Sequence, residues 1–254
     1  MPRAFLRSVL VYALLCSACG TGELLPEGSP EERFARADGY LARGKEQKSL
    51  EAYRELGRIY TGTEWEERAR LGIARSYRSM KEHPAAIQEY EAFIRRYPRS
   101  QWVDDADFEI GLCYADQRKK PELDQEMNLK ALAQFNDFLA EHPTSELVPR
   151  ARDEVKMART NLARKALENG ATYVKIRRYE AARFYFRLVA GEYADTDLAP
   201  EALYEIARTY EREKMPEEAA EAFEELRTRY PDSPWCARLE RSFGGTGAKG
   251  DGGT

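Results

Sequence analysis

The sequence predicts an all-α fold, a superhelix of five stacked helix pairs, on three observations. First, the 254 residues are 33% charged and 43% hydrophobic, and the helix formers Glu, Lys, Arg, Ala and Leu are abundant. Second, aromatic residues recur every 37 positions, as from Tyr40 to Tyr77 and from Tyr77 to Tyr114. Third, apolar residues between them step by three and four, as one face of a helix does. A fixed period of this length is typical of repeat architectures.

Residues 1–18 have the layout of a secretory signal peptide. MPRAFLR supplies two arginines, SVLVYALLC is a short apolar run, and SACG is a region of small residues suited to cleavage. The apolar run is well short of the roughly 20 residues that span a bilayer, so we expect no retained transmembrane helix.

Cys19 is the expected lipidation site. The stretch from Leu15 to Cys19 (LCSAC) resembles a bacterial lipobox, although Cys16 stands where such motifs usually carry Leu. The alternative is ordinary signal cleavage that leaves Cys19 as a thiol. We favour lipidation, because two or more acyl chains would anchor the protein stably. Gly20 follows the cysteine, and the absence of Asp there resembles an outer-membrane sorting signal. Residues 19–30 would then be a lipidated linker.

Residues 31–238 are expected to form the five helix pairs. In most pairs a small residue lies three positions before a Tyr on the first helix, and Ala and aromatic residues mark the second. In pair order, the markers are Ala37, Tyr40, Tyr53 and Leu56; Ala74, Tyr77, Ala86, Tyr90, Phe93 and Pro98; Gly111, Tyr114, Ala131, Phe135, Phe138 and Pro143; Gly170, Tyr173, Ala182, Phe186 and Val189; and Ala207, Tyr210, Ala219, Phe223, Leu226 and Pro231.

These markers have a simple packing interpretation. A small residue lets two helices approach closely while the Tyr ring fills the space beside it. On a second helix, Ala86, Tyr90 and Phe93 form one apolar stripe. Each pair buries its stripe only against its neighbours, so the pairs must stack. This is a tetratricopeptide repeat pattern, lengthened from the usual 34 residues by about three.

The junction AFIRRYPRSQW, near Tyr97, returns as ELRTRYPDSPW near Tyr230. Pro98 and Pro231 should end the second helix of their pairs, and the aromatic residues should pack against the next helix. We therefore interpret the recurring motif as a joint between repeats and not as a catalytic site.

Two irregularities interrupt the period. The interval from Tyr114 to Ala131 is 17 residues where the interval from Tyr77 to Ala86 is nine, which predicts an extra polar loop around KKPELDQEMN. The chain from Pro149 to Tyr173 has few turn signals, which predicts an unusually long first helix in the fourth pair. Such departures are where repeat scaffolds acquire surface specific to a partner.

The remaining features favour no catalysis. Residues 239–254 are Gly-rich and predict a flexible tail. Nucleotide-binding, metalloprotease and hydrolase motifs are absent from the sequence, and His83 and His142 both precede a proline in expected turns. A net charge of −4 argues against nucleic acid as a partner. Cys113 is expected to be a buried free thiol, with a disulfide to Cys236 as the alternative.

Several segments together resemble the BamD family of outer-membrane assembly lipoproteins. ADFEIGLCYADQ and LDQEMNLKALAQFNDFLAEHPTSEL look like that family's third repeat, with Asp124-Gln125 in its loop. ARTNLARKALENGATYVKIRRYEAARFYFRLVAGEYADT is similar to its long helix and the helix that follows. The resemblance runs from Phe34 to Trp235, and the order and irregular spacing of the repeats discriminate more than any single motif.

The resemblance implies a non-catalytic, lipid-anchored subunit of the outer-membrane β-barrel assembly (BAM) complex, facing the periplasm. It implies binding to the periplasmic POTRA domains of a BamA-like barrel protein, contact with other BAM lipoproteins, and reception of unfolded outer-membrane protein precursors. Cofactors are not expected, apart from the covalent lipid on Cys19. The surface for the barrel partner would lie on the C-terminal pairs, from Tyr173 to Trp235.

A peptide-binding groove is expected along the first helices of pairs one to three. Arg75 is the expected partner for an anion such as a terminal carboxylate. The alternative for Leu71, Phe108 and Leu112 is burial between repeats. The candidate groove residues are Phe34, Asp38, Leu71, Arg75, Phe108 and Leu112.

A rival interpretation is another envelope lipoprotein built on the same repeats, either a secretin pilotin or a coordinator of cell division and peptidoglycan synthesis. Coordinators usually place a coiled coil before the repeats, and residues 23–34 carry no heptad run.

Overall fold

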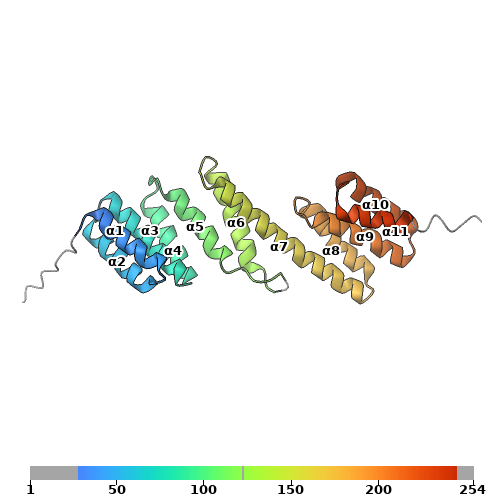
Figure 1. Ribbon diagram of the computed structural model, residues 1–254, viewed down its shortest axis with the longest axis horizontal. Coiled ribbons are helices and arrows are strands. Elements are labelled where there is room, and N and C mark those ends of the chain that lie inside the picture. Colours follow the sequence, from blue (N-terminus) through green and yellow to red (C-terminus); the bar gives the residue numbers. More distant parts are fainter. Residues whose placement is uncertain (1–27, 122, 245–254) are drawn as a thin grey trace, which may run out of the picture.

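The computed structural model describes residues 28–121 and 123–244, and throughout this part of the chain the regular structure is helical (Figure 1). The expected signal peptide, Cys19 and most of the linker lie outside the described residues. The helices are α1 (Pro30–Ala42), α2 (Glu46–Ile59), α3 (Glu64–Ser79), α4 (His83–Arg96), α5 (Val103–Ala115), α6 (Glu126–Glu141), α7 (Val148–Lys175), α8 (Tyr179–Glu192), α9 (Ala199–Glu213), α10 (Pro216–Arg229) and α11 (Pro234–Gly244).

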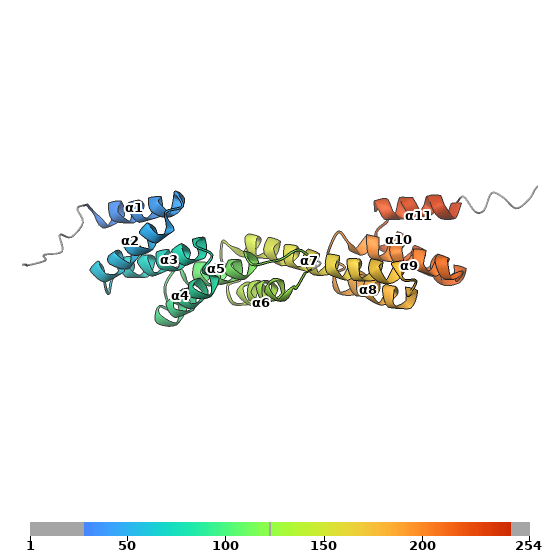
Figure 2. The same cartoon turned by 90° about the horizontal axis from the view of Figure 1, so that it is seen from below.

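The first ten helices form the five predicted pairs, each packed against the next along an extended molecule (Figures 1 and 2). The first helix begins at a capping box, in which the Ser29 hydroxyl accepts from Glu32 N and Glu32 Oε2 accepts from Ser29 N. The second helices of pairs two and five end at Arg96 and Arg229, directly before the Tyr-Pro sequences. The interpretation of AFIRRYPRSQW as a joint is thus confirmed.

In four of the pairs, the turn between the two helices contains one residue in the left-handed backbone conformation. Gly44, Lys81, Arg177 and Lys214 each have a φ near +60° and occupy the same place after a first helix. Glycine tolerates this left-handed conformation without steric cost, whereas the other three residues are strained by it. In the longer loop of the third pair, none of the described residues has a positive φ.

In the third and fourth pairs the close approach of the two helices depends on glycine, but the ring involved differs from the prediction. A Cβ built on Gly111 would lie 2.5 Å from Cε1 of Phe135, and one on Gly170 would clash with Phe186. The ring that fills the space is therefore a Phe on the second helix, and not the Tyr three residues along the first. The sequence could not distinguish the two, since both rings recur with the repeat.

Both irregularities are confirmed. The extra residues lie between Ala115 and Glu126, and α7 has 28 residues. Because of its length, α7 packs against α6 and also against α8. Asn128 of α6 donates to Ala158 O at 2.9 Å, and Arg159 donates to Glu192 O at the end of α8 at 2.5 Å. The start of α6 and the end of α8 thus both reach the middle of α7.

One helix was not predicted. α11 runs from Pro234 to Gly244, so the expected boundary of the repeat domain at residue 238 falls inside it, and residues 239–244 of the expected tail are helical. Leu239 and Cys236 are buried in the core of the last two pairs, and the Trp235 ring lies 5.0 Å from that of Tyr204. α11 therefore covers apolar surface that the last pair would otherwise expose.

Cys113 is buried, as predicted, and forms no disulfide with Cys236. Burial raises the pKa of the Cys113 thiol to about 12, which makes it unreactive near neutral pH.

Candidate peptide-binding groove

The groove is built on one face of α3. Arg68, Leu71, Arg75 and Arg78 follow one another at intervals of three, four and three, so they share a face of the helix. This face points toward α1 on one side and α5 on the other, and it lines two neighbouring hollows.

The smaller hollow, which we call the aromatic hollow, has a volume of about 170 Å³. The Arg68 guanidinium lies 5.1 Å from the Phe34 ring centre and 4.8 Å from that of Trp65, a cation–π arrangement. The Tyr53 hydroxyl donates to Asp38, and burial together with this carboxylate raises the pKa of Tyr53. The hollow is lined by Phe34, Asp38, Tyr53, Arg68, Leu71, Gly72, Arg75 and Trp102.

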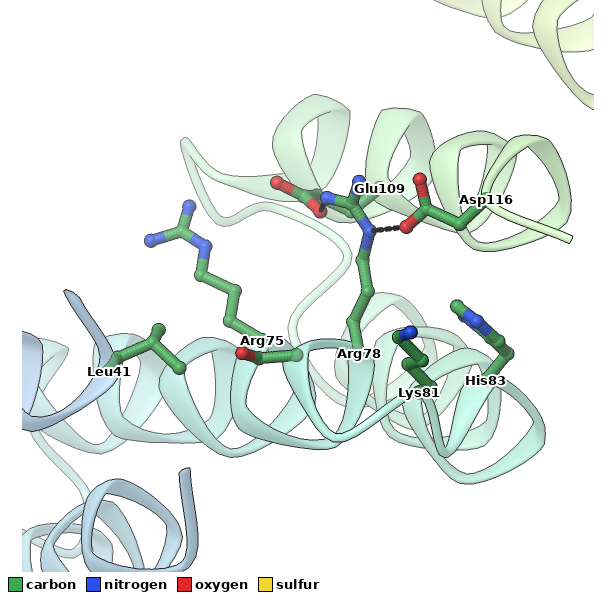
Figure 3. Close-up of a pocket in the computed structure, with 8 residues that line it drawn as sticks. Leu41, Arg75, Arg78, Lys81, His83, Glu109 and Asp116 are labelled. Carbon is green, nitrogen blue, oxygen red and sulfur yellow. Dashed lines mark hydrogen bonds and ion pairs between the residues drawn. The ribbon is translucent and has the colours of Figure 1, made fainter. Parts of the chain in front are cut away.

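The larger hollow, the basic hollow, has a volume of about 640 Å³ and is drawn in Figure 3. Arg78 is neutralised there, because its guanidinium lies 2.6 Å from Glu109 Oε2 and 2.7 Å from Asp116 Oδ2. Lys81 and His83 lie on the turn between α3 and α4 and at the start of α4 (Figure 3). The lining residues are Leu41, Arg75, Arg78, Ser79, Lys81, His83, Glu109 and Asp116.

Arg75 joins the two hollows into one groove. Its side chain lines both, is exposed, and extends from α3 into the open space beside Arg78 (Figure 3). In the described part of the chain, Arg75 makes no hydrogen bond or ion pair. An exposed guanidinium that forms no ion pair, beside a hollow lined by aromatic and polar residues, is suited to an incoming anion.

The predicted groove residues separate into two sets. Phe34, Asp38, Leu71 and Arg75 meet in the aromatic hollow, although Phe34 and Leu71 are each only 3% exposed and contribute mainly as its floor. Phe108 and Leu112 do not line it. They pack in the core of the third pair, with the Phe108 ring 5.4 Å from that of Phe135, which is the burial between repeats expected as their alternative.

Sequence reasoning missed the contributions of Arg68, Lys81 and His83. Arg68 could have been found, because it shares a helix face with Arg75. His83 was interpreted as a turn residue, yet it is buried, and no hydrogen-bond partner in the described chain reaches its Nδ1 atom. Only the folded turn brings its imidazole beside the basic hollow.

A second region of interest lies in the C-terminal pairs. A hollow of about 280 Å³, which we call the C-terminal hollow, opens between α8, α9 and α10. Glu218, Glu221, Glu225 and Arg229 line it from α10, and Arg187 lines it from α8. Arg229 forms an ion pair with Glu225 at 2.6 Å. It falls inside the segment from Tyr173 to Trp235 in which the partner surface was expected.

The fold defines this chain as a tetratricopeptide-repeat protein, and the model of that repeat matches residues 200–240. The model of the Outer membrane lipoprotein family (YfiO) matches residues 26–217, which is most of the chain. The chain therefore belongs to that family, and its predicted resemblance to the BamD family is confirmed. No helix in the described residues is long and apolar enough to cross a bilayer.

A curated relative agrees with this assignment. The outer membrane protein assembly factor BamD of Caulobacter vibrioides is 26% identical over 252 residues, covering 98% of this chain and 83% of that protein. Among solved structures, PilF of Pseudomonas aeruginosa is 17% identical with a TM-score of 0.35, covering 84% of this chain and 97% of that one. A thermophilic tetratricopeptide protein of Thermus thermophilus is 15% identical with a TM-score of 0.35, covering 84% and 98%.

Proposed function

We propose that this chain is a non-catalytic subunit of the machinery that assembles outer-membrane β-barrels, anchored to the outer membrane by lipid on Cys19. Membership in the Outer membrane lipoprotein family and similarity to BamD support the role in assembly. In this role the protein receives unfolded barrel precursors and holds them near a BamA-like partner.

Arg75 is the observation that carries the precursor site. It is the cation shared by the aromatic and basic hollows, and no carboxylate of the described chain pairs with it. An extended C-terminal segment of a precursor would place an aromatic side chain in the aromatic hollow and its terminal carboxylate on Arg75. Aromatic burial and a charge-assisted hydrogen bond are complementary to those two groups.

A peptide-binding assay tests the precursor site. We expect Arg75→Glu to weaken binding of a C-terminal barrel peptide at least tenfold, because an attractive charge becomes repulsive. Arg152→Glu makes the same charge change at an exposed position of α7 and should bind like wild type. Amidation of the peptide's C-terminus should remove most of the difference in affinity between the wild-type chain and Arg75→Glu. Unchanged affinity in Arg75→Glu would exclude this assignment.

The barrel partner is assigned to the C-terminal pairs, where the C-terminal hollow presents three carboxylates beside two guanidinium groups. Groups of both charges on one surface fix the orientation of a docked partner more than they increase its affinity. We expect the full chain to co-purify from outer membranes, in mild detergent, with a barrel protein that has POTRA domains. We expect Glu221→Lys to reduce that recovery while leaving peptide binding intact.

Recovery of a secretin, or of cell-division and peptidoglycan proteins, in place of the barrel protein would favour the rival lipoprotein classes. The two assays are independent, because peptide binding tests the groove on α3 and co-purification tests the surface of α8 to α10. A failure of peptide binding alone would remove the groove assignment and leave the assembly role standing.

A further inference from the structure

Three side chains with metal-binding atoms meet at the end of the third helix pair. Asp107 projects from α5, and Glu141 and His142 lie at the end of α6. One ligand atom of each lies within 4.8 Å of the others. The cluster is outside both the groove on α3 and the C-terminal hollow.

The repeat register shows that this joint differs from its counterpart in the second pair. On the first helix, Asp107 corresponds to Arg70, 37 residues earlier. Because the third pair has eight extra residues in its loop, Glu141 and His142 correspond to Arg96 and Tyr97, 45 residues earlier. Arg70 donates to the Tyr97 hydroxyl at 3.2 Å, and both arginines pair with Glu66. In the third pair, two arginines and a tyrosine have become two carboxylic acids and an imidazole.

One oxygen of the Asp107 carboxylate accepts a hydrogen bond, and the other does not. Gln134 Nε2 donates to its Oδ1 atom at 2.7 Å. Its Oδ2 atom is shielded from solvent, and no donor of good geometry in the described chain hydrogen-bonds to it. His142 Nε2 lies 3.3 Å from Oδ2, and the imidazole packs against the Phe138 ring at 5.1 Å between centres. In the described residues, no Lys or Arg forms an ion pair with Asp107 or Glu141.

The separation of these two atoms fits a shared metal ion. In a tetrahedral site with bonds of about 2.0–2.1 Å to nitrogen and oxygen, neighbouring ligand atoms lie about 3.4 Å apart. Glu141 is exposed, so its carboxylate can turn to supply the third ligand. An imidazole nitrogen in the set favours zinc and related transition ions over magnesium and calcium, which prefer oxygen ligands.

We propose that Asp107, Glu141 and His142 bind a divalent ion of the zinc class, with water completing the coordination. The bound ion would connect α5 to the end of α6 and thereby fix the joint from which α7 starts. It would also neutralise the two carboxylates that replace the arginines of the second pair. This inference is independent of the proposed role in barrel assembly.

Calorimetric titration of the chelator-treated full chain with zinc chloride tests the proposal. We expect one strong zinc site and at least tenfold weaker binding of magnesium. His142→Tyr restores the residue of the second pair's joint and keeps an aromatic ring against Phe138, so the fold should survive. We expect that variant, and Asp107→Asn, to bind zinc at least tenfold more weakly. Glu146→Gln, which removes a nearby exposed carboxylate, should leave zinc affinity unchanged.

Cobalt substitution identifies the ligands. The proposal requires a tetrahedral cobalt spectrum without a thiolate charge-transfer band, and it requires that spectrum to disappear in His142→Tyr. Absence of a zinc site, equal affinity in wild type and His142→Tyr, or a thiolate band from Cys113 or Cys236 would each overturn it.

Discussion

At the scale of single residues, Gly111 and Gly170 allow the helices of the third and fourth pairs to approach closely. Gly111 sits where a Cβ would meet the Phe135 ring at 2.5 Å, a distance that real Cβ contacts do not reach. Phe135 is fully buried and cannot swing away without opening the core of the third pair.

We therefore expect Gly111→Ala to lower the free energy of unfolding by about 1–3 kcal/mol through overpacking. Gly191→Ala is the matched control, because no heavy atom lies within 4 Å of its added Cβ. That change should raise stability by about 0.5 kcal/mol, since alanine is the better helix former. Urea denaturation measures both, and an equal effect of the two substitutions would contradict the packing argument.

The left-handed turn residues give a prediction of the opposite sign. Lys214 has a φ of +59° and ends α9, in the same place that Gly44 occupies in the first pair. Lys214→Gly should raise the free energy of unfolding by about 0.5–1 kcal/mol, because glycine relieves the strain. Arg212→Gly, inside the last turn of α9, should instead lower it by about 1 kcal/mol. Thermal and urea unfolding of the two variants compare them directly.

The groove shows what the sequence could predict at this scale. The repeat register placed Phe34, Asp38, Leu71 and Arg75 together correctly, because one residue per turn of a first helix faces the same way. It did not separate Phe108 and Leu112 from these four, although both pack into the core that contains Phe135 and Phe138 and do not line the aromatic hollow. Apolar periodicity identifies a buried face but does not say which neighbour covers it.

At the scale of elements, α11 acts as a cap on the stack. Leu239 is buried in the core that α11 shares with α9 and α10, and Trp235 lies against Tyr204. Its spacing was not recognised as a helix, because the Gly-rich sequence that follows carries none of the aromatic residues that mark a second helix in the other pairs.

Leu239→Ala should lower the free energy of unfolding by about 2–3 kcal/mol, the usual effect of deleting a buried leucine side chain. Arg241 lies two residues further along the same helix at an exposed position, and Arg241→Ala should change stability by less than about 0.5 kcal/mol. If urea denaturation shows little change in the free energy of unfolding of Leu239→Ala, the packing of α11 does not stabilise the last pairs.

The ninth helix carries a pH-dependent contribution. Burial raises the pKa of the Glu205 carboxyl, and the neighbouring Glu201 raises it further. Folding thus favours the protonated form, so this group's contribution is favourable at low pH and is lost as pH rises through the folded-state pKa.

We expect Glu205→Gln to raise the free energy of unfolding at pH 7 and to have little effect below pH about 4, where the unfolded carboxyl is also protonated. Denaturation curves at both pH values measure this. Glu217→Gln, at an exposed position in the first turn of α10, is the matched control and should not raise the free energy of unfolding at pH 7, because it removes a charge that interacts favourably with the helix N-terminus. A gain at Glu205 that is the same at both pH values would exclude the ionisation as its cause.

The long helix and the extra loop were predictable at this scale, since each follows from a count of residues between markers. The relative positions of α6 and α8 along α7 were not predictable, because they depend on how these two helices share the surface of α7.

At the scale of the whole molecule, contacts run mainly between neighbouring helices. Stability in such a stack is a sum of local terms, so damage should remain local. Leu226 is fully buried in the core of the last two pairs. Leu226→Ala should increase amide hydrogen exchange in α8 to α11 and leave α1 to α4 at the wild-type rate. Mass-spectrometric exchange along the chain checks this, and a uniform increase would indicate a single cooperative unit.

The length of α7 sets the spatial relation between the two ends of the molecule. Its 28 residues span about 42 Å as one unbroken helix, with the groove-bearing pairs before it and the C-terminal hollow after it. One residue inserted near its middle would turn the C-terminal pairs by about 100° relative to the groove. Seven inserted residues, close to two full turns, would nearly restore the orientation and lengthen the separation by about 10 Å. A precursor held in the groove and a partner docked on the C-terminal pairs would therefore face each other only for particular lengths of α7.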